Sequence, residues 1–459
     1  MQKDMSSRVD GAGAATPSKM DWKRLISDKR LGLEEFHDPR HHTRSDFQRD
    51  YDRLIFSSPF RRMQNKTQVF PLPGSVFVHN RLTHSLEVSS VGRSMANEVA
   101  LRLLDRHSDR DLMWQLMNIG DIVATACLSH DLGNPPFGHS GEKTISTFFT
   151  EGEGMALRPL LTDRQWSDLS NFEGNANSFR LLTHQFEGRR EGGFAMTYSA
   201  LAAVVKYPYS SGLAGEKGKF GFFESEEGIY RRVAEALGIP ELEPGRFARH
   251  PLVWLVEAAD DICYQVMDIE DAHRLKILST DEVMKLFLGF FSEERRAKML
   301  RMTARLHDPN EQIGYLRSNV IGAMVEDCAR AFCEHEDAIL TGEARGSLIE
   351  KMSPRLAEAY AECSATAHSR IYRSPEVVDI EIAGNRILTY LLSTLTEAAL
   401  HPERNFSQLL FEKVPAQYAM RSGDLFERIQ GMLDHVSGMT DVYALNLYRQ
   451  LRGLTLPAV

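Results

Sequence analysis

The chain has 459 residues, which is enough for about three average domains or for one large helical unit. Hydrophobic residues make up 42% of it and charged residues 25%, as in globular proteins with a substantial core. The net charge of −9 argues against a dedicated nucleic-acid-binding protein, so local Arg and Lys side chains would have to hold an anionic substrate.

The cysteines and the hydropathy pattern bear on the cellular compartment. The five cysteines are odd in number and show no CxxC pattern, which predicts buried free thiols in a reducing cytoplasm. The first residues contain no apolar run of the signal-peptide type, and the uninterrupted apolar stretch of about eighteen residues that a membrane span needs is missing. We therefore expect a cytoplasmic protein without a membrane partner.

The N-terminal part of the chain changes character twice. Residues 1–19 are rich in Gly, Ala and Ser and lack periodicity, which predicts a disordered tail. Residues 50–77 combine basic and aromatic side chains with prolines, which favours short helices and a turn. An amphipathic helix is expected from about Thr83, because apolar residues then recur every three or four positions as far as Val99.

Further helices are predicted on both sides of a break rich in glycine and proline. Apolar spacing predicts a helix over 119–127, with His130 extending its apolar face. Residues 133–138 must end this helix, and a new one is expected over 140–149. Another long helix is expected over 252–266.

Strand-like alternation is scarce along the chain. One hairpin is expected around residues 217–224, which include Gly218 and Gly221. From about Lys298 to the C-terminus, apolar residues again follow helical spacing. The sequence therefore predicts an all-α fold.

Two histidines and two aspartates in helical sequence form a candidate metal site. They are His84, His130, Asp131 and Asp260. Imidazoles and carboxylates together suit Mn²⁺, Mg²⁺, Fe²⁺ or Co²⁺, and such a site leaves coordination positions for water and a phosphate oxygen. A cation would also offset the cost of burying carboxylates beside apolar helix faces. Asp261 is the alternative to Asp260, which we favour because it shares a helix face with Tyr264.

Two spacings point to further functional side chains. If the segment after Gly138 is helical, His139 and Glu142 share one face. A carboxylate beside an imidazole orients it and raises its basicity, which would make a general acid–base pair. A helix-capping His with a surface Glu is the alternative. Asp260, Tyr264 and Asp268 are spaced four residues apart and form one helical stripe.

Three longer segments, in this order, carry a family resemblance. They are His130–Glu142 (HDLGNPPFGHSGE), Asn171–Ala176 (NFEGNA) and Glu257–Ile262 (EAADDI). With them, the chain resembles the HD-domain hydrolases, and within these the deoxyguanosine triphosphate triphosphohydrolase family, from about Tyr51 to Leu275 and again near Ser437–Asp441. The resemblance implies an all-helical fold and the conversion of a dNTP to deoxynucleoside and intact triphosphate. It accepts Asn134, where other HD proteins carry a further His, and this weighs against a second metal ion.

The resemblance also implies roles for individual residues. His139 and Glu142 would act on the attacking water or on the leaving 5′ oxygen. The ring of Tyr264 would leave no room for a 2′-hydroxyl, and Asp268 would accept a hydrogen bond from the 3′-hydroxyl. The other substrate-binding candidates are Arg81 for the nucleotide, Lys206 and Tyr207 for its phosphates, Gln68 for its sugar and base, and Asn175 without an assigned role.

These observations predict an HD-type catalytic core at residues 20–290 and a helical region at 291–459 that contributes to the substrate pocket and to oligomer contacts. The resemblance implies a homo-oligomer, a tetramer or a hexamer. The sequence neither predicts nor excludes single-stranded DNA as an allosteric effector.

Two other functions are compatible with the sequence. One is hydrolysis of another nucleotide phosphoester at the same metal site, and the other is a nucleotide- or single-strand-binding regulator with an inert site.

Overall fold

The computed structural model describes residues 19–35, 43–70, 78–107 and 112–455. The predicted tail lies outside these ranges apart from Lys19, and so do residues 71–77 of the proline-containing segment. Within the described ranges, the sheet content is one antiparallel pair, β1 (Glu241–Glu243) and β2 (Arg246–Phe247), and the other elements are helical. The all-α prediction is confirmed.

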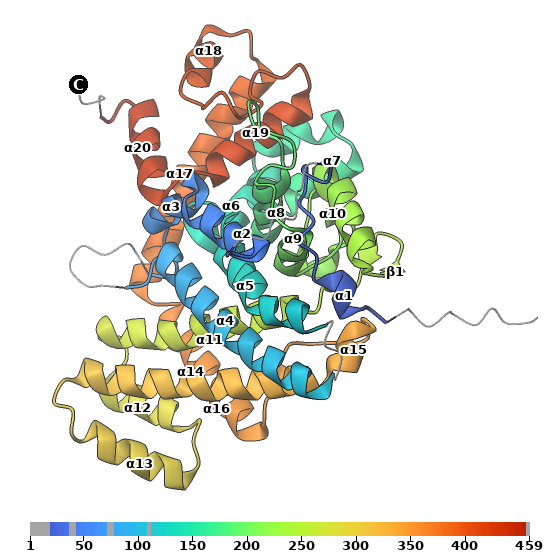
Figure 1. Ribbon diagram of the computed structural model, residues 1–459. Helices are drawn as coiled ribbons and strands as arrows, with labels where there is room; N and C mark the ends of the chain where they lie inside the picture. The colour runs from blue at the N-terminus through green and yellow to red at the C-terminus, as the bar shows by residue number, and fades with distance from the viewer. Residues whose placement is uncertain (1–18, 36–42, 71–77, 108–111, 456–459) are drawn as a thin grey trace, which may run out of the picture.

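Four long helices lie in the centre and the lower part of the molecule as drawn in Figure 1. They are α4 (Arg81–Arg106), α5 (Met113–Ser129), α11 (Val253–Arg274) and α14 (Pro309–Glu334), and α4 contacts the other three. A capping box starts α4: the Asn80 side chain accepts a hydrogen bond from the backbone N–H of Thr83, and the Thr83 side chain accepts one from the backbone N–H of Asn80. The helices predicted from about Thr83, over 119–127 and over 252–266 are confirmed.

A first hydrophobic core is formed by the packed faces of these long helices, and Val88, Ile122 and Leu255 are fully buried in it. Burying a side chain of this size contributes about 1.5 to 3 kcal/mol, so this core is a main source of stability. Shorter elements enclose it: α1 (Trp22–Leu25), α2 (Asp46–Ile55), α3 (Ser58–Arg62), η1 (Met63–Asn65), α9 (Tyr198–Val204), α10 (Glu224–Leu237), α12 (Thr280–Leu288), α13 (Glu293–Thr303), α15 (Glu336–Leu340), η6 (Ile349–Lys351), α16 (Pro354–Thr366) and η7 (Ala367–Ile371).

A second hydrophobic core lies in the upper part of Figure 1. It is built by α6 (Gly138–Thr150), η3 (Glu153–Leu160), α7 (Asp163–Ser170), α17 (Pro375–Leu400), α18 (Asn405–Phe411), α19 (Leu425–Ser437) and α20 (Asp441–Leu451). Helix α8 (Gly174–Thr183) contributes to both cores. The region 291–459 therefore serves two cores: residues as far as Val377 bury apolar side chains in the first, and residues from Ile387 in the second.

The hairpin predicted at residues 217–224 is wrong. This segment continues the turns η4 (Ser211–Leu213) and η5 (Gly215–Lys217) and then enters α10. Its glycines serve other purposes: Gly218 adopts φ +64°, and a Cβ on Gly221 would lie 2.2 Å from the carbonyl oxygen of Tyr207. Glycine here permits a close backbone approach, which sequence alone does not distinguish from a hairpin turn.

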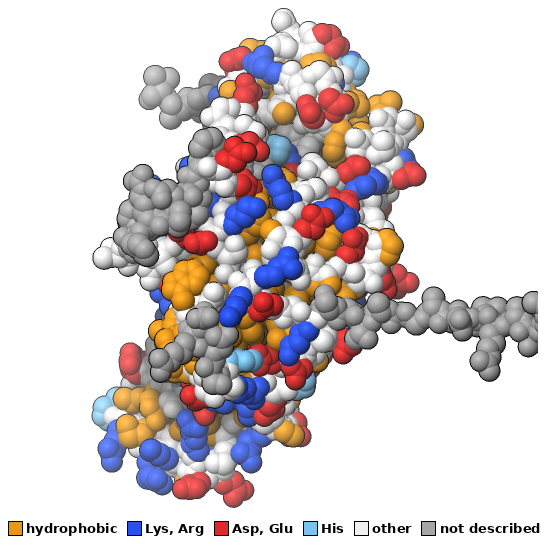
Figure 2. Space-filling model, turned by 45° about the vertical axis from the view of Figure 1, so that its right-hand side comes forward, with side chains coloured by type: hydrophobic (Ala, Val, Ile, Leu, Met, Phe, Trp, Pro, Cys, Tyr) orange, Lys and Arg blue, Asp and Glu red, His pale blue; other side chains and the backbone are white. Residues whose placement is uncertain are grey.

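The surface and the thiols agree with the composition. Acidic and basic side chains are interspersed over the face drawn in Figure 2. All five cysteines are buried free thiols, as predicted. Among the described helices, none combines the length and the apolar character that crossing a bilayer requires.

Candidate active site

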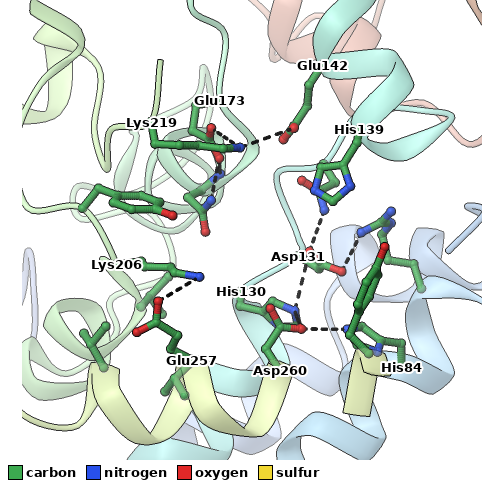
Figure 3. A pocket seen from close by; sticks show the side chains of 18 of the residues that line it. His84, His130, Asp131, His139, Glu142, Glu173, Lys206, Lys219, Glu257 and Asp260 are labelled. Carbon is green, nitrogen blue, oxygen red and sulfur yellow. Dashed lines mark hydrogen bonds and ion pairs between the residues drawn. The ribbon is translucent and has the colours of Figure 1, made fainter. Parts of the chain in front are cut away.

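A cavity of about 200 Å³ lies where the first core meets the second, and it gathers the predicted site residues (Figure 3). Its walls come from α4, the end of α5, the start of α6, the start of α8 and α11. Every predicted site residue except Asp268 lines it: Gln68, Arg81, His84, His130, Asp131, His139, Glu142, Asn175, Lys206, Tyr207, Asp260 and Tyr264. Residues separated by up to two hundred positions thus share one chamber.

The cluster suited to a metal ion consists of His84, His130 and Asp260. Asp260 Oδ1 lies 3.0 Å from His84 Nε2 and 3.4 Å from His130 Nε2, and one ligand atom of each residue lies within 4.8 Å of the others. His130 Nδ1 donates to the carbonyl oxygen of Cys127 at 2.6 Å, which leaves Nε2 to face the cavity. This buried Nε2 lacks a hydrogen-bond partner among the described residues, so the donor set fits a divalent cation.

The electrostatics of the cluster point the same way. Burial disfavours a charged imidazole, yet Asp131 and Asp260 raise the pKa of His130 to about 9. The same negative potential would attract a divalent ion, which would displace the proton on binding. Of the two adjacent aspartates, the structure brings Asp260 to the imidazoles, whereas Asp261 does not line the cavity.

Asp131 stands beside this cluster with partners of its own. Its Oδ1 lies 3.6 Å from His130 Nε2 and accepts a hydrogen bond from Asn134 Nδ2 at 2.6 Å. Its Oδ2 accepts from Arg81 Nη1 at 2.6 Å. Asn134 thus has a local role in orienting the carboxylate of Asp131. The assignment of Asp131 as a ligand stays a prediction.

His139 and Glu142 both face the cavity from α6, but they are not paired (Figure 3). Glu142 Oε1 accepts from the backbone N–H of Gly174 at 2.8 Å, and within the described chain no hydrogen bond joins Glu142 to His139. The expected rise in basicity is wrong: burial, with Arg81 and Lys219 nearby, lowers the pKa of His139. The imidazole is therefore kept neutral, the form that accepts a proton.

Cationic side chains lie across the cavity from His84 (Figure 3). Lys206 Nζ is 3.1 Å from Glu257 Oε1, and Lys219 Nζ is 2.6 Å from Glu173 Oε2. Lys219, Glu173 and Glu257 also line the cavity, although none of them was a predicted site residue. Glu173 and Glu257 stand in the segments that carry the resemblance, whereas Lys219 lies outside them.

The predicted stripe of Asp260, Tyr264 and Asp268 is only partly in the cavity. Tyr264 lines it, whereas Asp268 is buried and its Oδ2 accepts a hydrogen bond from the Tyr372 hydroxyl at 2.8 Å. The rings of Tyr264 and Tyr372 lie with their centroids 5.8 Å apart. Burial raises the pKa of Asp268 to about 8. Tyr372, from the region 291–459, thus contacts both Tyr264 and Asp268 of the stripe.

The class of the protein follows from two family models. One, for the HD domain, matches residues 81–165, which run from the start of α4 to the start of α7 and include His130 and His139. The other, described as a phosphohydrolase-associated domain, matches residues 351–450. Together with the His-His-Asp cluster, they define an HD-domain phosphohydrolase.

Similarity to curated relatives shows to which family of HD-domain phosphohydrolases the chain belongs. A deoxyguanosinetriphosphate triphosphohydrolase-like protein of Synechocystis is 37% identical over 95% of this chain and 100% of its own length. One of Pseudomonas aeruginosa is 36% identical over 96% and 100%. A deoxyguanosinetriphosphate triphosphohydrolase of Yersinia enterocolitica is 29% identical over 95% and 99%. The chain belongs to the deoxyguanosinetriphosphate triphosphohydrolase-like family and is a hydrolase.

Proposed function

We propose that this hydrolase converts deoxynucleoside triphosphates, with dGTP favoured or all four accepted, to the deoxynucleoside and intact triphosphate in a metal-dependent reaction. The observation that carries the proposal is the shared cavity: His84, His130 and Asp260 converge beside His139 and opposite two lysines. The relatives are named for the hydrolysis of deoxyguanosine triphosphate, which supports the same substrate.

The chemistry divides between an ion and the side chains. Held by His84, His130 and Asp260, with Asp131 beside them, a Mn²⁺ or Mg²⁺ ion would polarise the α-phosphate and acidify water, and Fe²⁺ or Co²⁺ would suit the same donors. Neutral His139 accepts a proton as a water oxygen bonds to the α-phosphorus. The bond from phosphorus to the 5′ oxygen breaks, and the imidazolium returns the proton to that oxygen. Glu142 accepts a hydrogen bond from the backbone N–H of Gly174 and lies 3.9 Å from the Lys219 ammonium, on the same side of the cavity as the proposed phosphate-binding lysine.

Substrate binding would use groups that already carry partners. Arg81, Lys206 and Lys219 are paired with carboxylates, and the triphosphate oxygens would share these cations. Gln68 Oε1 is buried and lacks a hydrogen-bond partner among the described residues, so it is free to accept one from the nucleotide. Tyr264 would pack on the sugar, with Tyr207 and Asn175 on the phosphate side and Asp268, bonded to Tyr372, behind it.

Product analysis tests this proposal. The purified chain would be incubated with each dNTP, and with GTP as control, in Mn²⁺ or Mg²⁺, and the products resolved by ion-exchange chromatography. We expect deoxynucleoside and intact triphosphate from dNTPs and no product from GTP. His130→Ala should abolish turnover, whereas His307→Ala, at an exposed histidine, should leave it unchanged. Stepwise phosphate release would instead favour an HD phosphohydrolase of another nucleotide phosphoester.

We propose further that the enzyme acts in the cytoplasm, in control of the dNTP pool, as a tetramer or hexamer. Light scattering coupled to size-exclusion chromatography measures the oligomer directly. A monomer at micromolar concentration would contradict this part of the proposal without affecting the reaction.

A further inference from the structure

We propose that Asp441, the first residue of α20, is a positioning residue that holds two walls of the catalytic cavity in place. The inference rests on the proposed function, because the cavity is taken as the catalytic one. Asp441 does not line the cavity, and it is buried, with 6% of its surface exposed. It belongs to the segment Ser437–Asp441 at the junction of α19 and α20, to which the reaction assigns no role.

The carboxylate of Asp441 binds two segments that are far away in the sequence. Its Oδ2 accepts from the backbone N–H of Thr67 at 2.8 Å and from the Thr67 hydroxyl at 2.5 Å, across 374 positions. Its Oδ1 accepts from the backbone N–H of Phe137 at 3.0 Å, across 304 positions. Both oxygens of one buried group are thus committed to N–H donors, an arrangement that only a carboxylate satisfies fully.

The contact with Phe137 restrains a strained turn. Phe137 adopts φ +64°, a left-handed conformation that is uncommon for a residue with a side chain, and Gly138 follows at φ +58°. A Cβ on Gly138 would lie 2.7 Å from Arg81 Nη2, so the turn runs directly against the arginine. His139 comes next and faces the cavity. The direction of the His139 side chain therefore depends on a backbone conformation that outside contacts must maintain.

The contact with Thr67 fixes the adjoining wall. The carbonyl oxygen of Thr67 accepts from Arg81 Nη2 at 3.2 Å, and Gln68, the next residue, lines the cavity. Lys66, one residue earlier, donates to the carbonyl oxygens of Ser437 at 2.8 Å and Asn134 at 2.5 Å. The junction of α19 and α20 is therefore hydrogen-bonded both to the segment 66–68 and to the turn before α6, and it holds the two in contact.

By this geometry, the C-terminal helices contribute to catalysis only by positioning cavity residues, and they supply no catalytic group themselves. Asp441 sets the separation of His139 from Arg81 and Gln68, while His84, His130 and Asp260 are held by helices of the first core. Loss of the carboxylate should thus disturb proton transfer and substrate placement but leave metal binding intact.

The test compares Asp441→Asn with Asp424→Asn in the full chain. Asp424 is the N-cap of α19 and touches neither wall, so it controls for loss of an aspartate at the start of a neighbouring helix. We expect Asp441→Asn to lower kcat for dGTP about tenfold or more, because small misplacements of reacting groups are costly. Mn²⁺ affinity, measured by paramagnetic resonance without nucleotide, should stay within about twofold. Amide hydrogen exchange should accelerate in peptides covering 66–69 and 136–142 in Asp441→Asn only.

A second variant probes the strained turn. Glycine adopts φ +64° without strain, so in a Phe137→Gly background the loss of kcat caused by Asp441→Asn should be smaller. Equal losses in both backgrounds, unchanged kcat and exchange in Asp441→Asn, or a fall in Mn²⁺ affinity matching that in kcat would overturn the proposal. If the wild type releases no triphosphate, the proposed function fails, and hydrogen exchange alone decides whether Asp441 holds the two walls.

Discussion

Lys219 and Glu173 show how a single side-chain pair prepares the cavity for an anion. The Lys219 ammonium lies 2.6 Å from Glu173 and 3.9 Å from Glu142, and these carboxylates raise its pKa against the effect of burial. The lysine is therefore kept charged in a partly buried place. A bound triphosphate would compete with Glu173 for it, so part of the binding energy is spent on separating the pair.

Replacing Lys219 should affect substrate binding more than the chemical step. We expect Lys219→Met to raise KM for dGTP about tenfold with a smaller change in kcat, because one charge-assisted contact to the triphosphate is lost. Steady-state kinetics would measure this. Lys217→Met, at an exposed lysine two positions away, is the matched control and should leave both constants unchanged. A loss confined to kcat would place Lys219 in the chemical step instead.

At the scale of elements, the start of α11 depends on a buried neutral histidine. His250 Nδ1 accepts from the backbone N–H of Leu252 at 3.2 Å, and its Nε2 lies 3.2 Å from the carbonyl oxygen of Leu25. The ring thereby ties α11, which carries Asp260, to the end of α1. Protonation would remove the acceptor, and complete burial lowers the pKa of His250 to about 4.

This histidine should make stability depend on pH. Its pKa is 6.5 when unfolded and about 4 when folded, so between these values the unfolded state binds more protons. The contribution is present above pH 6.5 and is lost as pH falls toward 4, by about 3 kcal/mol in total. We expect His250→Gln to be less stable at pH 7 and to lose less stability between pH 7 and 5 than the wild type.

Urea unfolding at pH 7, 6 and 5 would measure the difference. His307→Gln, at a histidine on the surface, should follow the wild type at each pH. Parallel pH profiles for His250→Gln and the wild type would contradict the assignment of His250 as a neutral buried group.

At the scale of the whole molecule, a buried ion network joins the two cores. Arg180 in α8 donates from Nε and Nη2 to Asp434 in α19, both at 2.8 Å, and from Nη1 to Glu226 in α10 at 2.7 Å. All three side chains are at least nine-tenths buried. Because α19 leads directly into the junction that holds Asp441, this network also fixes the second core relative to the cavity.

Removing the arginine should destabilise the fold strongly. Arg180→Met leaves two buried carboxylates without their cation, and we expect the free energy of unfolding to fall by about 3 to 5 kcal/mol. Denaturant titration measures it. Arg421→Met breaks the exposed pair with Glu412 and should cost less than about 1 kcal/mol. Similar small costs for both variants would show that the network adds little to the docking of the two cores.

Helical periodicity and short motifs were readable because they depend on neighbours in the sequence. The helices from about Thr83, over 119–127 and over 252–266 follow from spacings of three and four, which place side chains on one face whatever the tertiary context. The prediction of a hairpin at 217–224 was wrong because Gly218 serves a left-handed turn, with φ +64°, and Gly221 allows the close approach of the Tyr207 carbonyl oxygen. A local sequence pattern shows where glycine permits an unusual backbone conformation, but not which distant contact requires the glycine.

The sequence by itself determined the helical class, the family and which residue types would meet at the cavity, since motif order and spacing are local properties. Only the tertiary structure decided their partners: Glu142 is bonded to Gly174 instead of His139, and Lys219 lies beside Glu173. It alone brought Asp441 to Thr67 across 374 positions. Such pairings depend on how helices dock, and docking is set by the packing of whole apolar faces, which no short stretch of sequence encodes.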